Sequence, residues 1–118
     1  KSQRKKLGKM QLSIANKELP VKWENNKSVD ALKRLTPLTI KMSMYGGFEQ
    51  VGHLNKSIIS DDRQTKTIPG DIVLYSSNQI VVFYGSNSWA YTKLGHINLG
   101  KKELRKLLSH GSVKLTLK

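Results

Sequence analysis

Apolar and polar residues alternate along much of the chain, which is the pattern of β-strands with one buried face. The first such segment begins at Met10, and residues 19–23 alternate again after a turn at Asn16-Lys17, so these two segments are predicted to form a hairpin. Further alternating segments are expected at residues 38–45, 48–54, 72–75, 89–97 and 113–117.

Two other regions depart from alternation. Residues 79–84 are almost wholly apolar and rich in β-branched and aromatic side chains, which predicts a central strand buried on both faces. Residues 55–69 are mostly polar and are predicted to form one long loop. Loops of that length in a small domain are commonly functional, so this one is a candidate part of a site.

Helical spacing appears in two short segments. Val29, Leu32 and Leu35 form the first apolar stripe, with Asn26 or Ser28 as the N-cap, and Pro37 ends that helix. The second helix is expected at residues 101–108, with Gly111 in the left-handed position after it. The chain is therefore predicted to be mainly β, a closed eight-stranded barrel with two short helices that cover its ends.

Composition narrows the chemistry. The 118 residues include no cysteine, which excludes disulfides, thiolate zinc sites and thiol nucleophiles. The three histidines lack metal-ligand spacing, and no phosphate-binding glycine motif is present, so neither a metal nor a cofactor is expected. Residues 10–118 are predicted to form one domain, preceded by a basic, flexible lead-in over residues 1–9.

The formal net charge is +13, and it is concentrated at the two ends of the chain. Such a field attracts anionic surfaces or polymers. Nucleic acid is a weaker candidate because no aromatic platform interleaves the basic groups. No apolar stretch approaches the ~20 residues that span a bilayer. The start at Lys1 suggests an upstream segment, and a signal or lipoprotein segment there would place the domain outside the bacterial cytoplasm.

Three separated motifs resemble a known family. They are Met44-Tyr45-Gly46-Gly47-Phe48-Glu49, Pro69-Gly70-Asp71-Ile72-Val73-Leu74-Tyr75, and Tyr84 with Tyr91-Thr92-Lys93-Leu94-Gly95-His96-Ile97. Their order is similar to that of the bacterial cyclophilin-like domains, which are distinct from true cyclophilins, over nearly all of 10–117. The resemblance implies an eight-stranded barrel with two helices. Relatives are sometimes joined to flavodoxin-like domains, which implies a binding or accessory role.

The long loop departs from the family pattern. Relatives often carry Pro-Arg-Asn-Asp or Pro-Thr-Asn-Asp where this chain has Ile59-Ser60-Asp61-Asp62, so only Asp62 is kept, although Arg63 follows it. The arginine, phenylalanine and histidine constellation of true proline isomerases is not matched either.

The candidate site gathers around the first motif. Paired glycines at 46 and 47 predict a bulge or a left-handed turn. Aromatic residues at strand ends could line a groove, with Tyr45 and Trp89 the foremost candidates. Glu49 and Asp71 could do acid–base work if one cleft held both, although Asp71 also suits a turn. The ligand-binding candidates are Tyr45, Glu49, Asp62, Arg63, Trp89 and Tyr91.

Three functions remain open from the sequence. The first is a binding or accessory module whose groove, formed by the 45–49 turn, the 55–69 loop and the Trp89 loop, holds a peptide segment or a small molecule. The second is an enzyme, a proline isomerase or another activity, that uses the same groove with Arg63 as donor. The third is electrostatic binding of polyanions by residues 1–9 and the 101–106 helix.

Overall fold

The computed structural model describes residues 10–118, so the predicted lead-in at 1–9 lies outside the described part. Within that part the chain forms ten strands and two helices. In chain order they are β1 (Leu12–Ile14), β2 (Lys17–Leu19), β3 (Val21–Trp23), α2 (Lys27–Arg34), β4 (Leu38–Tyr45), β5 (Glu49–His53), β6 (Arg63–Lys66), β7 (Asp71–Tyr75), β8 (Gln79–Phe83), β9 (Ser88–Ile97), α3 (Lys101–Leu108) and β10 (Val113–Leu117).

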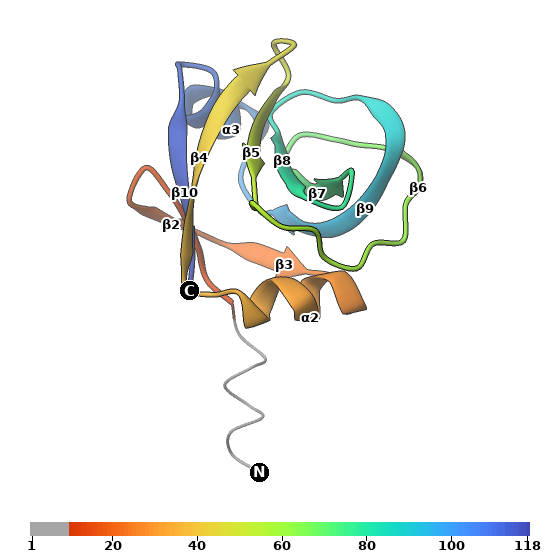
Figure 1. Cartoon of the computed structure of the whole chain (residues 1–118). Helices are drawn as coiled ribbons and strands as arrows, with labels where there is room; N and C mark the ends of the chain where they lie inside the picture. The colour runs from red at the N-terminus through yellow and green to blue at the C-terminus, as the bar shows by residue number, and fades with distance from the viewer. Residues whose placement is uncertain (1–9) are drawn as a thin grey trace.

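The strands make one strongly curved antiparallel sheet (Figure 1). Nine of them follow one hydrogen-bonded path in the order β2-β1-β10-β4-β5-β8-β7-β9-β3, and β6 pairs with β9 off that path. The first and last strands of the path, β2 and β3, are consecutive in the chain and are linked through Pro20. The result is a nearly closed barrel, which confirms the predicted mainly β class.

The strand count differs from the expected eight for two physical reasons. The expected strand at 19–23 is interrupted at Pro20, which has no backbone N–H to donate. As a result β2 pairs with β1, as the predicted hairpin requires, while β3 turns away and pairs with β9. The second reason is β6, which lies inside the segment that was expected to be a single loop at 55–69.

The turn between β4 and β5 is built on its two glycines. Gly46 and Gly47 have φ values of 65° and 73°, so the predicted left-handed turn is confirmed. A Cβ atom on Gly46 would lie 2.3 Å from the ring of Phe48, whereas one on Gly47 would meet nothing within 4 Å. This turn brings Tyr45 opposite Glu49 in the β4–β5 register.

The two helices lie toward opposite ends of the molecule (Figure 1). In α2 the Oδ1 atom of Asn26 accepts a hydrogen bond from the backbone N–H of Val29 at 2.9 Å, so Asn26 is the N-cap. The C-terminal end of α3 is held by Gln50, whose Nε2 donates to the carbonyls of Leu108 and Gly111. Neither helix of the described chain is long and apolar enough to cross a membrane.

The sheet buries two separate apolar clusters. The larger one includes Ile72, Leu74, Ile80 and Val82, and it extends to β1, β10 and both helices. The smaller one consists of Val73, Val81, Phe83 and Tyr91, with Phe48, Val51 and Tyr75 packed against it. Because successive residues of β7 and β8 belong to different clusters, the prediction that residues 79–84 are buried on both faces is confirmed.

Candidate functional site

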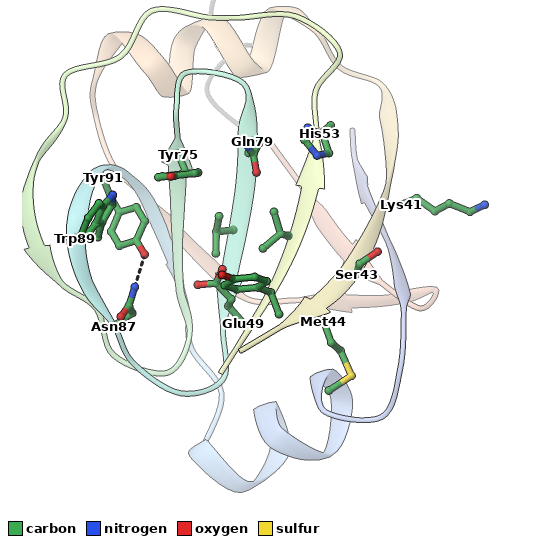
Figure 2. Close-up of a pocket in the computed structure, with 13 residues that line it drawn as sticks. Lys41, Ser43, Met44, Glu49, His53, Tyr75, Gln79, Asn87, Trp89 and Tyr91 are labelled. Atoms are coloured by element: carbon green, nitrogen blue, oxygen red, sulfur yellow. Dashed lines mark hydrogen bonds between the residues drawn. The ribbon is translucent and has the colours of Figure 1, made fainter. Parts of the chain in front are cut away.

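A cavity of about 530 Å³ opens beside the smaller apolar cluster. Side chains from β4, β5, β7, β8 and β9 surround it, and Figure 2 shows Glu49 between Asn87, Tyr91 and Trp89 on one side and Ser43 and Met44 on the other. We call it the aromatic cavity; the residues that line it are Lys41, Ser43, Met44, Tyr45, Glu49, Val51, His53, Tyr75, Gln79, Val81, Asn87, Trp89 and Tyr91.

Strand alternation explains why these residues meet. In the β4–β5 ladder Tyr45 pairs with Glu49, and Val51 of β5 pairs with Val81 of β8. Residues that pair directly across an antiparallel ladder point to the same face of the sheet, as do residues two apart on one strand. The odd-numbered positions that line the aromatic cavity in β4, β5, β7 and β8 therefore share one face, and most even-numbered positions face the larger core. Met44 near the end of β4 is an exception, because it is exposed and also lines the cavity.

Glu49 is the unusual group of the cavity. Its residue surface is only 7 % exposed, and its Oε1 atom has no hydrogen-bond partner. Desolvation by burial disfavours the carboxylate and raises the pKa of Glu49 to about 7. The side chain can therefore change its protonation state near neutral pH, so it could serve a ligand either as a donor or as an anionic acceptor.

Tyr91 and Tyr75 form an aromatic corner of the cavity. Their ring centroids are 6.0 Å apart with an interplanar angle of 66°. The Nδ2 of Asn87 donates to the hydroxyl oxygen of Tyr91 at 2.8 Å (Figure 2), which leaves the hydroxyl hydrogen of Tyr91 available for another acceptor. Burial raises the pKa of Tyr91, and the charges of Glu49 and Tyr75 add to the rise, whereas the Asn87 hydrogen bond lowers it.

The structure thus brings four of the six candidate residues, Tyr45, Glu49, Trp89 and Tyr91, to one cavity. Tyr45 and Trp89 are 65 % and 56 % exposed, which places large apolar rings at the rim rather than in the core. Phe48 and Tyr84, two other aromatic residues near strand ends, do not line the cavity. Phe48 packs against the smaller cluster, and Tyr84 is buried in the larger one.

Asp62 and Arg63 lie elsewhere, which corrects the expectation that one groove holds all six. The Oδ1 of Asp62 accepts from the hydroxyl of Thr92 at 2.6 Å. Arg63 binds the Asp61 carboxylate at 3.0 Å and lines a second, polar cavity between α2 and the 59–65 segment. The β6–β9 pairing sets Arg63 opposite Tyr91, which borders both cavities. Arg63 is held by Asp61 and Asp62 by Thr92, and neither of the two side chains lines the aromatic cavity.

Asp71 is not beside Glu49 either. Its Oδ1 lies 2.8 Å from His96 Nδ1 and 3.6 Å from Lys93 Nζ, and its Oδ2 accepts from the backbone N–H of Ile68 at 3.0 Å. This is the turn and strand-start role that its position after Pro69-Gly70 indicates. The Glu49–Asp71 acid–base pair therefore lacks the shared cleft that it would need.

Sequence reasoning missed several lining residues, among them Tyr75, Gln79 and Asn87. The signal that could have found Tyr75 is its spacing of two from Val73, once Val73 is assigned to the cavity side of β7. Because β7 and β8 are buried on both faces, hydrophobic alternation alone cannot tell which face borders a cavity. Asn87 sits just before β9, where no strand period applies.

No cluster of three or more histidine or acidic side chains suited to a metal occurs within residues 10–118. That no metal is bound stays a prediction from the sequence.

The chain was compared with curated proteins and with models of protein families. No curated protein matches the chain. The cyclophilin-like family matches it over residues 12–118, which is the entire barrel from β1 to the end of β10. The match agrees with the nearly closed antiparallel sheet and the two helices described above. The chain belongs to the cyclophilin-like family.

Proposed function

We propose that this chain is a binding or accessory module that holds a small molecule, or a short segment of a peptide, in the aromatic cavity. The observation that carries the proposal is the combination of a nearly buried Glu49, whose Oε1 is unpaired, with the rings of Tyr45, Tyr75, Trp89 and Tyr91. A volume of about 530 Å³ lies within the range of small-molecule sites, which pair apolar walls with a few polar groups.

The test is a fragment and peptide screen followed by NMR and thermal melting. A ligand that binds only the folded state raises the melting temperature. Bound fragments should shift the backbone signals of residues 45–51 and 87–91. Trp89→Ala should weaken the binding of an aromatic fragment by about tenfold, because the ring of the fragment loses a stacking partner worth ~1 kcal/mol or more.

Ile68→Ala is the matched control for that variant. Ile68 is exposed to 54 %, close to the value for Trp89, but it does not line the cavity. The control should bind as the wild type does. A screen in which no compound raises the melting temperature, or in which all hits shift residues outside the cavity, contradicts the proposal.

The isomerase and polyanion-binding hypotheses depend on different parts of the structure. The isomerase hypothesis needs Arg63 as a donor in the aromatic groove, and Arg63 lines the polar cavity instead. Polyanion binding draws on α3, where Lys102, Arg105 and Lys106 are exposed. Because no residue of α3 lines the aromatic cavity, the two kinds of binding are separable, and attachment to a polyanion should weaken steeply as salt is raised.

A further inference from the structure

We propose that the ligand of the aromatic cavity is an organic cation, a protonated or quaternary amine whose charge lies between the carboxylate of Glu49 and the rings of Tyr75, Tyr91 and Trp89. This inference rests on the proposed binding function and names the chemical class of its ligand. Two independent features support it: a buried carboxyl group without a counter-charge, and aromatic rings from several strands around it.

The first feature is the unpaired carboxyl. Burying a carboxylate is costly unless it is paired or hydrogen-bonded. Glu49 takes part in none of the three ion pairs found in the described chain, which involve Asp61 and Asp71 instead. With its Oε1 also free of hydrogen bonds, the protein itself supplies no partner for the charge of this side chain. A ligand cation would supply it.

The second feature is the set of rings. The face of a tyrosine or tryptophan ring attracts a cation within ~6 Å of its centroid, most strongly when water is excluded. Tyr75 and Tyr91 meet edge to face as a corner, and Trp89 and Tyr45 stand at the rim. Rings around a carboxylate suit an ammonium group better than an anion, and they suit a neutral group only through apolar contact.

The other charged or titratable side chains that line the cavity do not neutralise Glu49. Lys41 of β4 is exposed and its chain extends away from the cavity (Figure 2). His53 of β5 is also exposed and forms no ion pair within residues 10–118. The remaining ones are Tyr45 of β4, Tyr75 of β7 and Tyr91 of β9, whose hydroxyls are neutral when protonated.

A cationic ligand should therefore bind with a characteristic pH dependence. The ligand requires the carboxylate, while burial raises the pKa of Glu49 in the free protein to about 7. The ionised fraction then grows about tenfold between pH 6 and pH 8, and the apparent affinity should grow by about the same factor. Proton release on binding is the accompanying signal.

The experiment compares choline with 3,3-dimethyl-1-butanol, which has nearly the same shape without the charge. Binding is followed by NMR on the full chain, through the signals of Glu49, Tyr75 and Tyr91, at pH 6 and pH 8. We expect choline to bind at least about tenfold more tightly than the neutral alcohol at pH 8, as a cation–π contact plus a charge pair requires. Benzyltrimethylammonium serves as a second, larger cation probe.

Two variants separate the contributions. Glu49→Gln should weaken choline binding by about tenfold or more and remove its pH dependence, whereas the matched exposed control Glu103→Gln should change neither. Trp89→Leu should weaken choline binding several-fold. Since Trp89 is largely exposed, that variant is expected to fold and keeps the test valid even if Glu49→Gln is unstable.

The outcomes distinguish the two levels of the proposal. Equal or tighter binding of the neutral alcohol, or undiminished choline binding to folded Glu49→Gln, overturns the cation inference. If neutral fragments occupy the cavity and neither cation does, the inference fails while the binding function stands. If no probe or fragment of any kind binds, both fail.

Discussion

At the scale of single residues, Glu49 couples the aromatic cavity to the stability of the fold. Because burial raises its pKa to about 7, the folded protein retains this proton to a higher pH than the unfolded chain, in which the pKa is near 4.5. The raised pKa does not lower the free energy of unfolding below pH 4.5. It lowers the free energy of unfolding increasingly between pH 4.5 and about 7, and by its full amount above that. The charged side chain therefore destabilises the ligand-free fold at alkaline pH.

The corresponding prediction concerns Glu49→Gln, which removes the charge at nearly constant shape. At pH 8 the variant should raise the free energy of unfolding by about 1–3 kcal/mol over the wild type, and at pH 4.5 the two should be almost equal. Urea unfolding at both pH values measures the difference, with Glu103→Gln as the exposed control. A gap between variant and wild type that is the same at both pH values would show that Glu49 does not titrate as described.

At the scale of elements, the β4–β5 turn fixes the position of Tyr45 and Glu49 through two glycines of different sensitivity. Gly46→Ala and Gly47→Ala place a Cβ at similar positive φ values, so both should lose about 1 kcal/mol from backbone strain. Only Gly46→Ala adds a clash, with the ring of Phe48, and we expect it to lose a further ~1–2 kcal/mol.

Thermal or urea unfolding of the two variants, side by side, measures this difference. Phe48 stacks on Phe83 at 6.4 Å with an interplanar angle of 5°, so its displacement by Gly46→Ala should also shift the ring signals of Phe83. Equal losses of stability for the two variants would mean that Phe48 moves aside freely, and that the turn does not hold the rim of the cavity in place.

The sequence predicts most of the strands and helices but not how the strands pair. Alternation predicts the long strands, and cap chemistry predicts α2, because those signals are local: Asn26 caps the helix that follows it. The partner of a strand is not local. Alternation predicted one strand over 19–23, and nothing local indicated that β3 would separate at Pro20 and pair with β9. Residues 63–66 were predicted to be polar loop because β6, exposed or half-buried along its length, buries no apolar face.

At the scale of the whole molecule, the sheet separates a structural core from a cavity with a candidate function. Period-two patterning reveals this separation wherever one face is polar. Tyr45 and Glu49 could be placed together from the sequence because both flank the paired glycines of the β4–β5 turn. In β7 and β8 both faces are apolar, so Tyr75 was missed. Arg63 was expected in the groove, but it forms an ion pair with Asp61 and lines the second cavity, and no local pattern in the sequence indicates that contact.

Adjacent residues of β8 test this division directly. Val81 belongs to the smaller cluster and lines the aromatic cavity, while Val82 belongs to the larger core, and both are almost fully buried. Val81→Ala and Val82→Ala remove the same two methyl groups, so each should lower the free energy of unfolding by about 1–3 kcal/mol. The two variants should differ in which neighbouring side chains show shifted NMR signals.

Val81→Ala should shift the ring signals of Tyr75 and Tyr91 in NMR spectra, because its side chain packs in their cluster, whereas Val82→Ala should leave those rings nearly unchanged. Val82→Ala should instead shift methyl signals of the larger core, such as those of Leu74 and Ile80. Similar perturbation of Tyr75 and Tyr91 by both variants would mean that the two clusters respond as one core. In that case substitutions anywhere in the barrel would change the cavity, and its shape could not be altered independently of the fold.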